Sequence, residues 1–397
     1  MAITDKKTGV WGLDQTYNKI NQGSIWSYSG ASALHFWNYN SWGRFGLNYV
    51  GSPGNPSSLS GNRASSPIQI PDSSNWKFPK EKLNNPWIAR TDGTMWAMGS
   101  NTYGNLGQNS TISYSSPVQV GGGTDWDESY ESVFAGSGIK TDGTLWICGR
   151  NRYGVLGLNQ AHDARISSPT QIPGSWDHIS THSHAAGVKT DGTLWVWGSN
   201  ASGKLGINQP DNSHRSSPVQ IPGTTWSGVR SGTNISVATK TDGTLWAWGA
   251  NSTGGLGQNN RTQYSSPVQI PGTTWPTDRT QFVANDINMF AVKTDGTLWC
   301  CGNNNSGVLG QNQSQPGLAA ISSPTQIPGT TWSRVSGSGD NNNIQATKTD
   351  NTLWMWGTGA ALAVNSNASY SSPIQVPGIW DYRYLQSGTV SAAIQIQ

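Results

Sequence analysis

The side chains best suited to metal binding or proton transfer are three histidines close together in the sequence, His178, His182 and His184. The last two are two residues apart, which would place them on one face of a β-strand. Imidazole is a common zinc ligand, but a zinc site needs further ligands, and no cysteine or carboxylate shares this spacing. We therefore expect a group of surface histidines and no metal site.

The three cysteines, Cys148, Cys300 and Cys301, offer no second chemistry. Each lies in a strand-like run, where a thiol is typically a small buried hydrophobic group. Their number does not predict a disulfide framework. The sequence also lacks the Gly-x-Ser-x-Gly, Walker and His-Glu-x-x-His motifs, and no nucleophile can be paired with a base. We expect no enzymatic activity, no catalytic residues and no cofactor.

A repeat of about 50 residues supplies the elements that hold these side chains. The phrase Lys-Thr-Asp-Gly-Thr-Leu-Trp occurs at 140–146, 189–195, 240–246 and 293–299, with variants at 90–96 and 348–354. Asp-Gly between two strand-like runs is a strong signal for a tight β-hairpin. A period of this length with a hairpin inside it indicates a β-propeller or a solenoid.

One repeat predicts four short strands. The runs 235–240 and 244–249 flank the hairpin turn, and Ser-Ser-Pro-Val-Gln-Ile at 265–270 forms a third strand. A Pro-Gly turn then leads to Trp275 and a fourth, less regular strand. Four antiparallel strands of this kind make one propeller blade, whose two apolar faces need neighbouring blades to cover them.

Two counts predict seven blades. Ser-Ser-Pro occurs seven times, and so does the tryptophan after the third strand, at positions 76, 126, 176, 226, 275, 332 and 380. The segment 34–48 matches the second strand and loop of a repeat, and 390–397 matches a first strand. The C-terminal strand is therefore expected to pair with residues 33–38 and close the ring. The sequence predicts an all-β fold, a seven-bladed propeller of four-stranded antiparallel blades over 30–397, with a separate arm at 1–29.

The pattern Gly-x-Asn-x-x-Gly-x-Leu-Gly-x-Asn, a Ser-Ser-Pro strand and Lys-Thr-Asp-Gly-Thr-Leu-Trp-x-Trp-Gly resembles the repeat of the RCC1 (regulator of chromosome condensation) family of seven-bladed propellers. The resemblance covers about 30–397 and implies a fold rather than a shared function. Relatives in that family include a nucleotide exchange factor for a nuclear GTPase and a secreted bacterial inhibitor of β-lactamases. The exchange factor depends on a wedge-like insertion. Because the repeats here differ by only a few residues, we do not expect exchange activity.

Composition argues against two kinds of partner. Charged residues make up 11% of the chain and the net charge is +3, with no run of Lys or Arg, so we expect no nucleic-acid partner. No apolar stretch approaches the roughly 18 residues of a membrane span. The N-terminal residues lack the apolar segment of a signal peptide. A surface rich in amides and hydroxyls rather than ions is typical of extracellular and virion β-proteins.

The repeated lysines and aspartates would form two rings around the axis, the lysines being Lys140, Lys189, Lys240, Lys293 and Lys348. Such rings could hold an anionic ligand. Alternatively the aspartate shapes the hairpin turn, with the lysine beside it as a solvated partner. We favour the second interpretation.

Loop aromatics are the candidates for a binding surface. Tyr103 and Tyr153 occupy corresponding positions in the glycine-rich loops of two successive repeats, and we take them as candidate partner-binding residues. Further candidates are Tyr114, Tyr264 and Tyr370.

The arm, residues 1–29, carries large apolar side chains on a segment too short to bury them by itself. Asp14 is a potential cap for a two-turn helix that would end at Gly23. The pattern Gly-Val-Trp-x-Leu followed by a second tryptophan resembles the N-termini of many tailed-phage virion proteins. That resemblance implies an anchor that docks on other virion proteins through Trp11, Leu13, Tyr17, Ile20, Trp26 and Tyr28.

Two functional hypotheses follow. The first is a non-enzymatic phage virion protein, such as a tail, fibre or capsid-decoration component, assembled in the host cytoplasm. Its arm would attach it, and its propeller would be a display or adhesion module for a host surface protein or glycan. The alternative is a soluble protein-binding or inhibitor propeller that uses one loop face and is independent of any virion.

Overall fold

The computed structural model describes residues 33–39, 43–47, 63–69, 76–77, 87–131, 135–338, 342–358, 362–364, 368–387 and 390–395. The predicted arm, with its helix and all six candidate anchoring residues, lies outside this part of the chain. In the described residues the regular elements are β-strands and single-turn 3₁₀ helices (η). None of the described helices has the length and apolar character needed to cross a bilayer.

The strands of the first half are β1 (Ala33–Tyr39), β2 (Arg63–Gln69), β3 (Trp87–Ala89), β4 (Met95–Gly99), β5 (Tyr114–Gln119), β6 (Trp126–Glu131), β7 (Ala135–Lys140), β8 (Leu145–Arg150), β9 (Arg165–Ile172), β10 (Trp176–Thr181), β11 (His184–Lys189), β12 (Leu194–Gly198) and β13 (Arg215–Ile221). Those of the second half are β14 (Trp226–Ser231), β15 (Ile235–Lys240), β16 (Leu245–Gly249), β17 (Tyr264–Ile270), β18 (Phe282–Asn285), β19 (Asn288–Val292), β20 (Leu298–Asn303), β21 (Ala320–Ile327), β22 (Trp332–Ser338), β23 (Asn343–Lys348), β24 (Leu353–Gly357), β25 (Tyr370–Val376), β26 (Trp380–Ser387) and β27 (Val390–Gln395). The 3₁₀ turns are η3 (Arg152–Gly154), η4 (Ala201–Gly203), η5 (Arg279–Gln281) and η6 (Asn305–Gly307).

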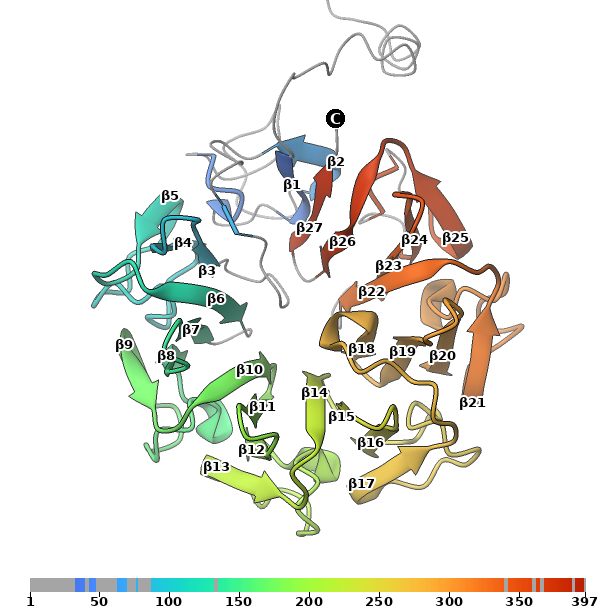
Figure 1. Ribbon diagram of the computed structural model, residues 1–397, viewed down its shortest axis with the longest axis horizontal. Helices are drawn as coiled ribbons and strands as arrows, with labels where there is room; N and C mark the ends of the chain where they lie inside the picture. The colour runs from blue at the N-terminus through green and yellow to red at the C-terminus, as the bar shows by residue number, and fades with distance from the viewer. Residues whose placement is uncertain are drawn as a thin grey trace, which may run out of the picture.

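The described strands form seven antiparallel sheets arranged radially around an axis (Figure 1). Six sheets have four strands, and β3-β4-β5 has three, beside an isolated bridge between Trp76 and Arg90. In the blades β6–β9, β10–β13, β14–β17, β18–β21 and β22–β25, chain order runs from the axis to the periphery. The all-β, seven-bladed architecture is therefore confirmed.

The remaining sheet contains both ends of the described chain, in the order β2-β1-β27-β26. β1 and β27 pair antiparallel, from Ala33 opposite Gln395 to Asn38 opposite Val390. The predicted pairing of residues 33–38 with the C-terminal strand is confirmed.

The sequence repeat and the blade are offset by one strand, which corrects the expected blade composition. The strand after each Pro-Gly turn opens the next blade, as β14 does for β14–β17. The reason is that the outermost strand ends at the rim, and the chain must return to the axis before a new blade can begin. The return segment bonds to two hairpin turns, because Trp226 N–H donates to Gly192 O at 3.1 Å and Thr241 N–H donates to Thr225 O at 2.9 Å. Each crossover thereby ties two successive blades.

Hydrogen bonds explain the repeated motif. In the 140–146 copy, Thr144 donates its N–H and O–H to Asp142 Oδ1 at 2.9 and 2.7 Å, and Trp146 Nε1–H donates to Thr144 Oγ1 at 3.0 Å. The other five copies make the same three bonds. The bonds from Thr144 lower the pKa of Asp142. The prediction that this aspartate shapes the turn is confirmed.

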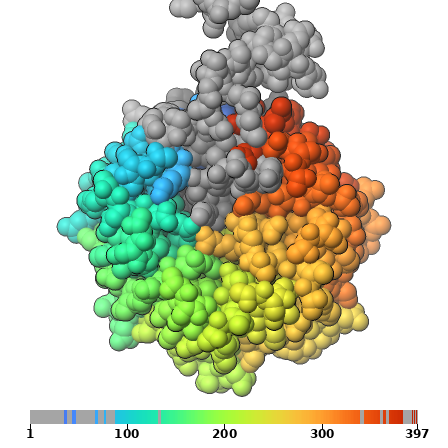
Figure 2. Space-filling view, viewed as in Figure 1, coloured from blue at the N-terminus to red at the C-terminus, as the bar shows by residue number. Residues whose placement is uncertain are grey.

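A second set of tryptophans links neighbouring blades, which touch side by side around the axis (Figure 2). Trp197, Trp248 and Trp356 are fully buried, and each donates Nε1–H to a backbone carbonyl in the glycine loop of the preceding blade. The Trp356 bond reaches Val308 O at 2.7 Å. Each of these side chains therefore packs in its own blade and bonds it to the preceding one.

Cysteine replaces this tryptophan in two blades. Cys301 Sγ lies 3.3 Å from Gly255 O, the corresponding loop carbonyl. Cys148 takes the same position in the β6–β9 blade. The loop carbonyl of the preceding blade, Asn105 O, accepts instead from Nε1–H of Trp87, which lies in β3 of that same preceding blade, at 2.8 Å. All three cysteines are buried and free, as the sequence predicts.

Trp356→Phe is expected to destabilise the propeller by about 1–3 kcal/mol, because it leaves a buried carbonyl without its donor and removes packed atoms. The urea midpoint of unfolding, followed by circular dichroism, measures the loss. Trp354→Phe is the matched control, because Trp354 is half-buried and bonds only within its own hairpin. Equal losses in the two variants would contradict the linking role.

Candidate functional site

The two loop tyrosines singled out from the sequence lie in the loops of neighbouring blades and are connected there through other side chains. Tyr103 follows β4, and Tyr153 lies in η3 after β8. Arginine and histidine side chains surround both rings. We call this group the rim cluster, consisting of Tyr103, Arg150, Arg152, Tyr153, His162, Asp163, Arg165 and His214.

At the Tyr103 end, the ring carries two guanidinium groups. Arg150 and Arg165 are cross-strand neighbours in β8 and β9, and their Cζ atoms lie 5.1 and 5.4 Å from the Tyr103 ring centroid. Arg150 also donates from Nε and Nη2 to the two carboxylate oxygens of Asp163, both at 2.9 Å. The Arg165 guanidinium is exposed and makes no hydrogen bond or ion pair with the described residues. Stacking therefore orients an arginine whose donors remain available to a partner.

At the Tyr153 end, the ring lies between two imidazoles. Its centroid is 4.9 Å from that of His162 and 4.7 Å from that of His214. The backbone of Tyr153 has φ 56°, a left-handed conformation that Ser202 and Ser306 adopt at the same loop position in other blades. This conformation is costly for a bulky side chain, on the order of 1–3 kcal/mol, and such residues often cluster at binding sites.

Asp163 connects the two ends of the cluster. Besides the Arg150 pair, its Oδ2 lies 3.6 Å from His162 Nδ1. The cluster contains three arginines and one carboxylate, which leaves an excess of positive charge. Burial, followed by the charge of Lys204, lowers the pKa of His214, so this ring is neutral at pH 7. The surface formed is cationic and aromatic.

The other three tyrosines proposed from the sequence do not join this cluster. Tyr114, Tyr264 and Tyr370 are half-buried first residues of the outermost strands β5, β17 and β25. Sequence reasoning also missed the arginines and histidines of the cluster. Two of the arginines, Arg150 and Arg165, form one extra residue pair at the end of β8 and β9, beyond Gly149. In β12 the strand already ends at the corresponding glycine.

The prediction of surface histidines is wrong. His178, His182 and His184 are 0%, 8% and 0% exposed, because β10 and β11 have a neighbouring blade on each face. His178 Nδ1 donates to Asp177 Oδ2 at 2.7 Å, and its Nε2 accepts from Val229 N–H at 3.2 Å. Burial lowers the pKa of His178 to about 4. With both ring nitrogens engaged, this side chain ties two blades and cannot serve as a base.

The prediction of solvated lysines is also wrong. The lysine or arginine that begins each copy of the motif lies between two indole rings. Lys240 Nζ, for example, is 4.8 Å from the centroid of the Trp226 ring and 4.4 Å from that of the Trp246 ring. The cause is strand register, because Trp226 of the innermost strand pairs directly with Lys240. Arg90 and the four other lysines are held in the same way. The ring of lysines is thus a set of cation–π contacts.

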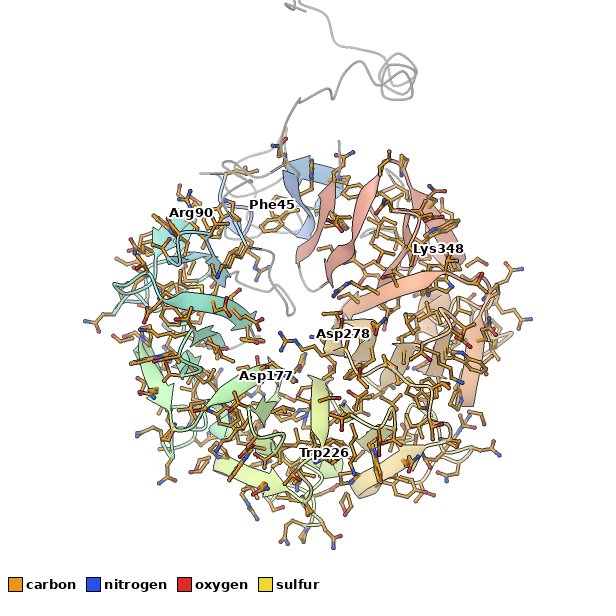
Figure 3. All side chains as sticks on the ribbon, viewed as in Figure 1. Phe45, Arg90, Asp177, Trp226, Asp278 and Lys348 are labelled. Atoms are coloured by element: carbon orange, nitrogen blue, oxygen red, sulfur yellow. The ribbon has the colours of Figure 1, made fainter. Side chains whose placement is uncertain are left out.

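A second charged group lies at the axis, where Figure 3 shows Asp177 and Asp278. Arg279 Nη2 donates to Glu128 Oε2 at 2.7 Å, and both side chains are 12% exposed. Their sheets, β6–β9 and β18–β21, are separated by two others, so this pair spans the axis. Tyr130 also donates to Glu128. The carboxylate is fully engaged and functions as a tie across the ring.

The cysteines have no nucleophilic character. Burial raises the pKa of Cys301 to about 12, and raises that of Cys148 and Cys300 as well. Within the part of the chain that the structure describes, no three His, Cys, Asp or Glu side chains are grouped so as to hold a metal ion.

The buried neutral state of His178 predicts an acid-sensitive fold. An unfolded histidine has a pKa near 6.5, so the unfolded state takes up the proton before the folded state does as pH falls. The contribution of His178 to the free energy of unfolding is fully present above about pH 6.5. It is lost as the pH falls towards 4, by about 3 kcal/mol in all. Urea unfolding at several pH values measures this. His178→Gln keeps a donor and an acceptor but does not titrate, so its profile should be flatter, with His162→Gln on the exposed rim as the control. Parallel profiles for the wild type and His178→Gln would refute the assignment.

Comparison with known proteins identifies the repeat. The model of the regulator of chromosome condensation (RCC1) repeat matches residues 92–138, 142–187, 191–239 and 242–278. A search of curated protein sequences found no match.

Solved structures show the same fold at low sequence identity. Human WBSCR16 is 17% identical with a TM-score of 0.76, covering 92% of this chain and 99% of its own. Prp20p from Saccharomyces cerevisiae is 15% identical with a TM-score of 0.74, covering 93% of each chain. Yeast RCC1 (Prp20) in its complex with Kap60 gives the same identity and TM-score, covering 100% of this chain and 96% of that chain. Four segments of the chain therefore match the regulator of chromosome condensation repeat, and the protein has the fold of RCC1-type β-propellers.

Proposed function

We propose that the protein is a non-enzymatic component of a phage virion, in which the N-terminal arm docks on other virion proteins and the propeller is a display or host-adhesion module. The rim cluster is the observation that carries the binding part of this proposal. Tyrosine and arginine are the residues most enriched at the energetic centres of protein interfaces. Here they are positioned by stacking before any partner arrives, which reduces the ordering cost of binding.

The absence of a competent catalytic group among the described residues supports a binding role. The thiols are buried with raised pKa values, and His178 has both ring nitrogens bonded. The axial carboxylate Glu128 is already paired with Arg279. The side chains of the repeated motif are bonded within their hairpins. The rim cluster is therefore the better candidate for binding a partner.

The assignment to a virion rests on the sequence of the arm. Its large apolar residues, Trp11, Leu13, Tyr17, Ile20, Trp26 and Tyr28, follow a pattern that resembles tailed-phage virion proteins. Such a segment gains stability by burying these side chains against a partner subunit. The protein would then be located in the virion, after assembly in the host cytoplasm.

A second candidate is a soluble binding propeller that acts without a virion. The rim cluster favours this second candidate, because all residues of the cluster belong to the propeller and none belongs to the arm. The yeast relative Prp20p is described with binding properties to Gsp1p and histones, so this architecture is compatible with protein partners. The arm distinguishes the two candidates.

Deletion of residues 1–28 is expected to leave the thermal unfolding of the propeller unchanged and to abolish its incorporation into phage particles. Co-expression with the phage structural proteins, followed by density-gradient purification and immunoblotting, measures incorporation. A deletion variant that still enters particles would refute the anchoring role. A collapse of thermal stability would favour the soluble module instead, with the arm as part of its fold.

Arg165→Gln is expected to weaken retention of the labelled full-length protein on host cells by about tenfold, the equivalent of one interface hot spot. Flow cytometry of cells incubated with labelled protein measures retention. Arg261→Gln is the matched control, because Arg261 is an exposed loop arginine in the β14–β17 blade and loses the same charge. Equal effects of the two substitutions would indicate a general charge effect and refute the role of the rim cluster.

A further inference from the structure

A groove of about 540 Å³ opens between the β6–β9 and β10–β13 blades, next to the rim cluster. Its lining includes Leu158, Gln160, Gln171, Lys189 and Trp195. The hydrogen bond from Asn159 N–H to Ser216 O, at 2.7 Å, joins the two blades at the groove. This volume falls within the range of about 300–1,000 Å³ typical of ligand sites.

One residue of the lining, Leu158, differs from its counterpart in several other blades. In three other blades a glutamine follows the last glycine of the loop, and its Nε2 reaches the backbone of the outermost strand. Gln108 donates to Gln119 O at 2.9 Å, Gln258 to Gln269 O at 3.0 Å, and Gln311 to Gln326 O at 3.1 Å.

Leu158 occupies this position in the β6–β9 blade, so the corresponding carbonyl of Gln171 receives no side-chain donor. Gln171 lines the groove, so its carbonyl is a backbone acceptor that a ligand can use.

The chemistry of the lining is mixed in a specific way. Apolar surface comes from Leu158, Ile166, Pro173 and Pro218, which suits the C–H faces of a sugar ring. Amides and hydroxyls of the lining suit sugar hydroxyl groups, and these belong to Asn159, Gln160, Thr170, Gln171 and Ser217.

A cation completes the groove. Lys189 Nζ is held 4.0 Å from the Trp195 ring centroid and 5.1 Å from that of Trp176. The equivalent Lys140 pairs with Asp125 at 3.0 Å, but a serine, Ser175, stands in that place next to Lys189. Lys189 forms no ion pair with the described residues. Its charge is thus available to an acidic group on the ligand.

We propose that this groove binds an acidic oligosaccharide, with sugar hydroxyls on the amides and on the carbonyl of Gln171, and with a carboxylate towards Lys189. This inference rests on the proposed adhesion function and names the chemical class of its target. An open groove at a rim admits a chain, whereas an enclosed cavity would admit only a small metabolite. The amide-rich lining favours a saccharide over an acidic peptide.

The test is an array of immobilised oligosaccharides ending in glucuronate, galacturonate or sialic acid, printed beside their neutral counterparts and a poly-glutamate peptide. The full-length protein is compared with Leu158→Gln, which introduces the side-chain hydrogen bond that three other blades contain and so blocks the carbonyl of Gln171 in the groove. Ile207→Gln is the matched control, because Ile207 holds the same repeat position in the β10–β13 blade, whereas the groove is lined by Leu158. Thermal unfolding of all three proteins verifies folding.

The expected result is that the wild type and Ile207→Gln bind carboxylated glycans over neutral ones and that Leu158→Gln binds them about tenfold more weakly, the cost of blocking one hydrogen-bond acceptor. Absence of glycan binding by the wild type, equal binding by Leu158→Gln, equal binding of neutral glycans, or preference for poly-glutamate would each overturn the proposal. Arm-dependent entry into particles is measured separately, so a protein that assembles but binds no arrayed glycan refutes the groove and leaves the virion role standing.

Discussion

Every blade of this propeller has two buried faces, and a blade can cover neither by itself. In strand β16, Leu245 and Ala247 point to one face of the sheet and Trp248 points to the other, and all three are fully buried. The remaining interactions serve this mutual covering. Indole N–H groups bond to the loop carbonyl of the preceding blade, each crossover segment bonds to two hairpin turns, and Arg279 reaches Glu128 across the axis. The stability of the propeller therefore depends on contacts between blades rather than on any one blade.

The sequence predicts the number of blades, the hairpins and the pairing of β1 with β27, because each depends on local signals that repeat. It does not predict the phase of the blades, since a circular arrangement of identical units has no marked beginning and the Trp strand fits either neighbour. Burial of His178 and His184 escapes prediction for a related reason. A polar residue normally marks a solvent-facing position, but here its partners, Val229 and Ser236, come from a different blade about 50 residues further along the chain.

The candidate site was partly predictable. Tyr103 and Tyr153 occupy the same loop position in adjacent repeats, so the fold necessarily brings them to the same rim. The guanidinium of Arg165 could not be placed in advance, because its position over Tyr103 depends on one extra β8–β9 pair beyond the usual end of the strand. The groove was equally hidden, since Leu158 is unremarkable as a residue and becomes informative only beside the glutamines that bond in the other blades.

The repeat itself gives a way to separate structure from function in this chain. Residues of the hairpin motif, which recurs in six blades, have a structural partner: the aspartate accepts from its threonine, the threonine accepts from its tryptophan, and the cation lies between two indoles. Other residues are not shared by all the repeats, and three of them fall in one blade: Tyr153, a bulky side chain in a left-handed conformation that serine adopts in two other blades, Arg165, which makes no ion pair with the described residues, and Leu158, where three other blades have a bonding glutamine. Their concentration on the β6–β9 blade, against its two neighbours, argues that this sector is where the propeller meets its target, while the other blades maintain the ring that presents it.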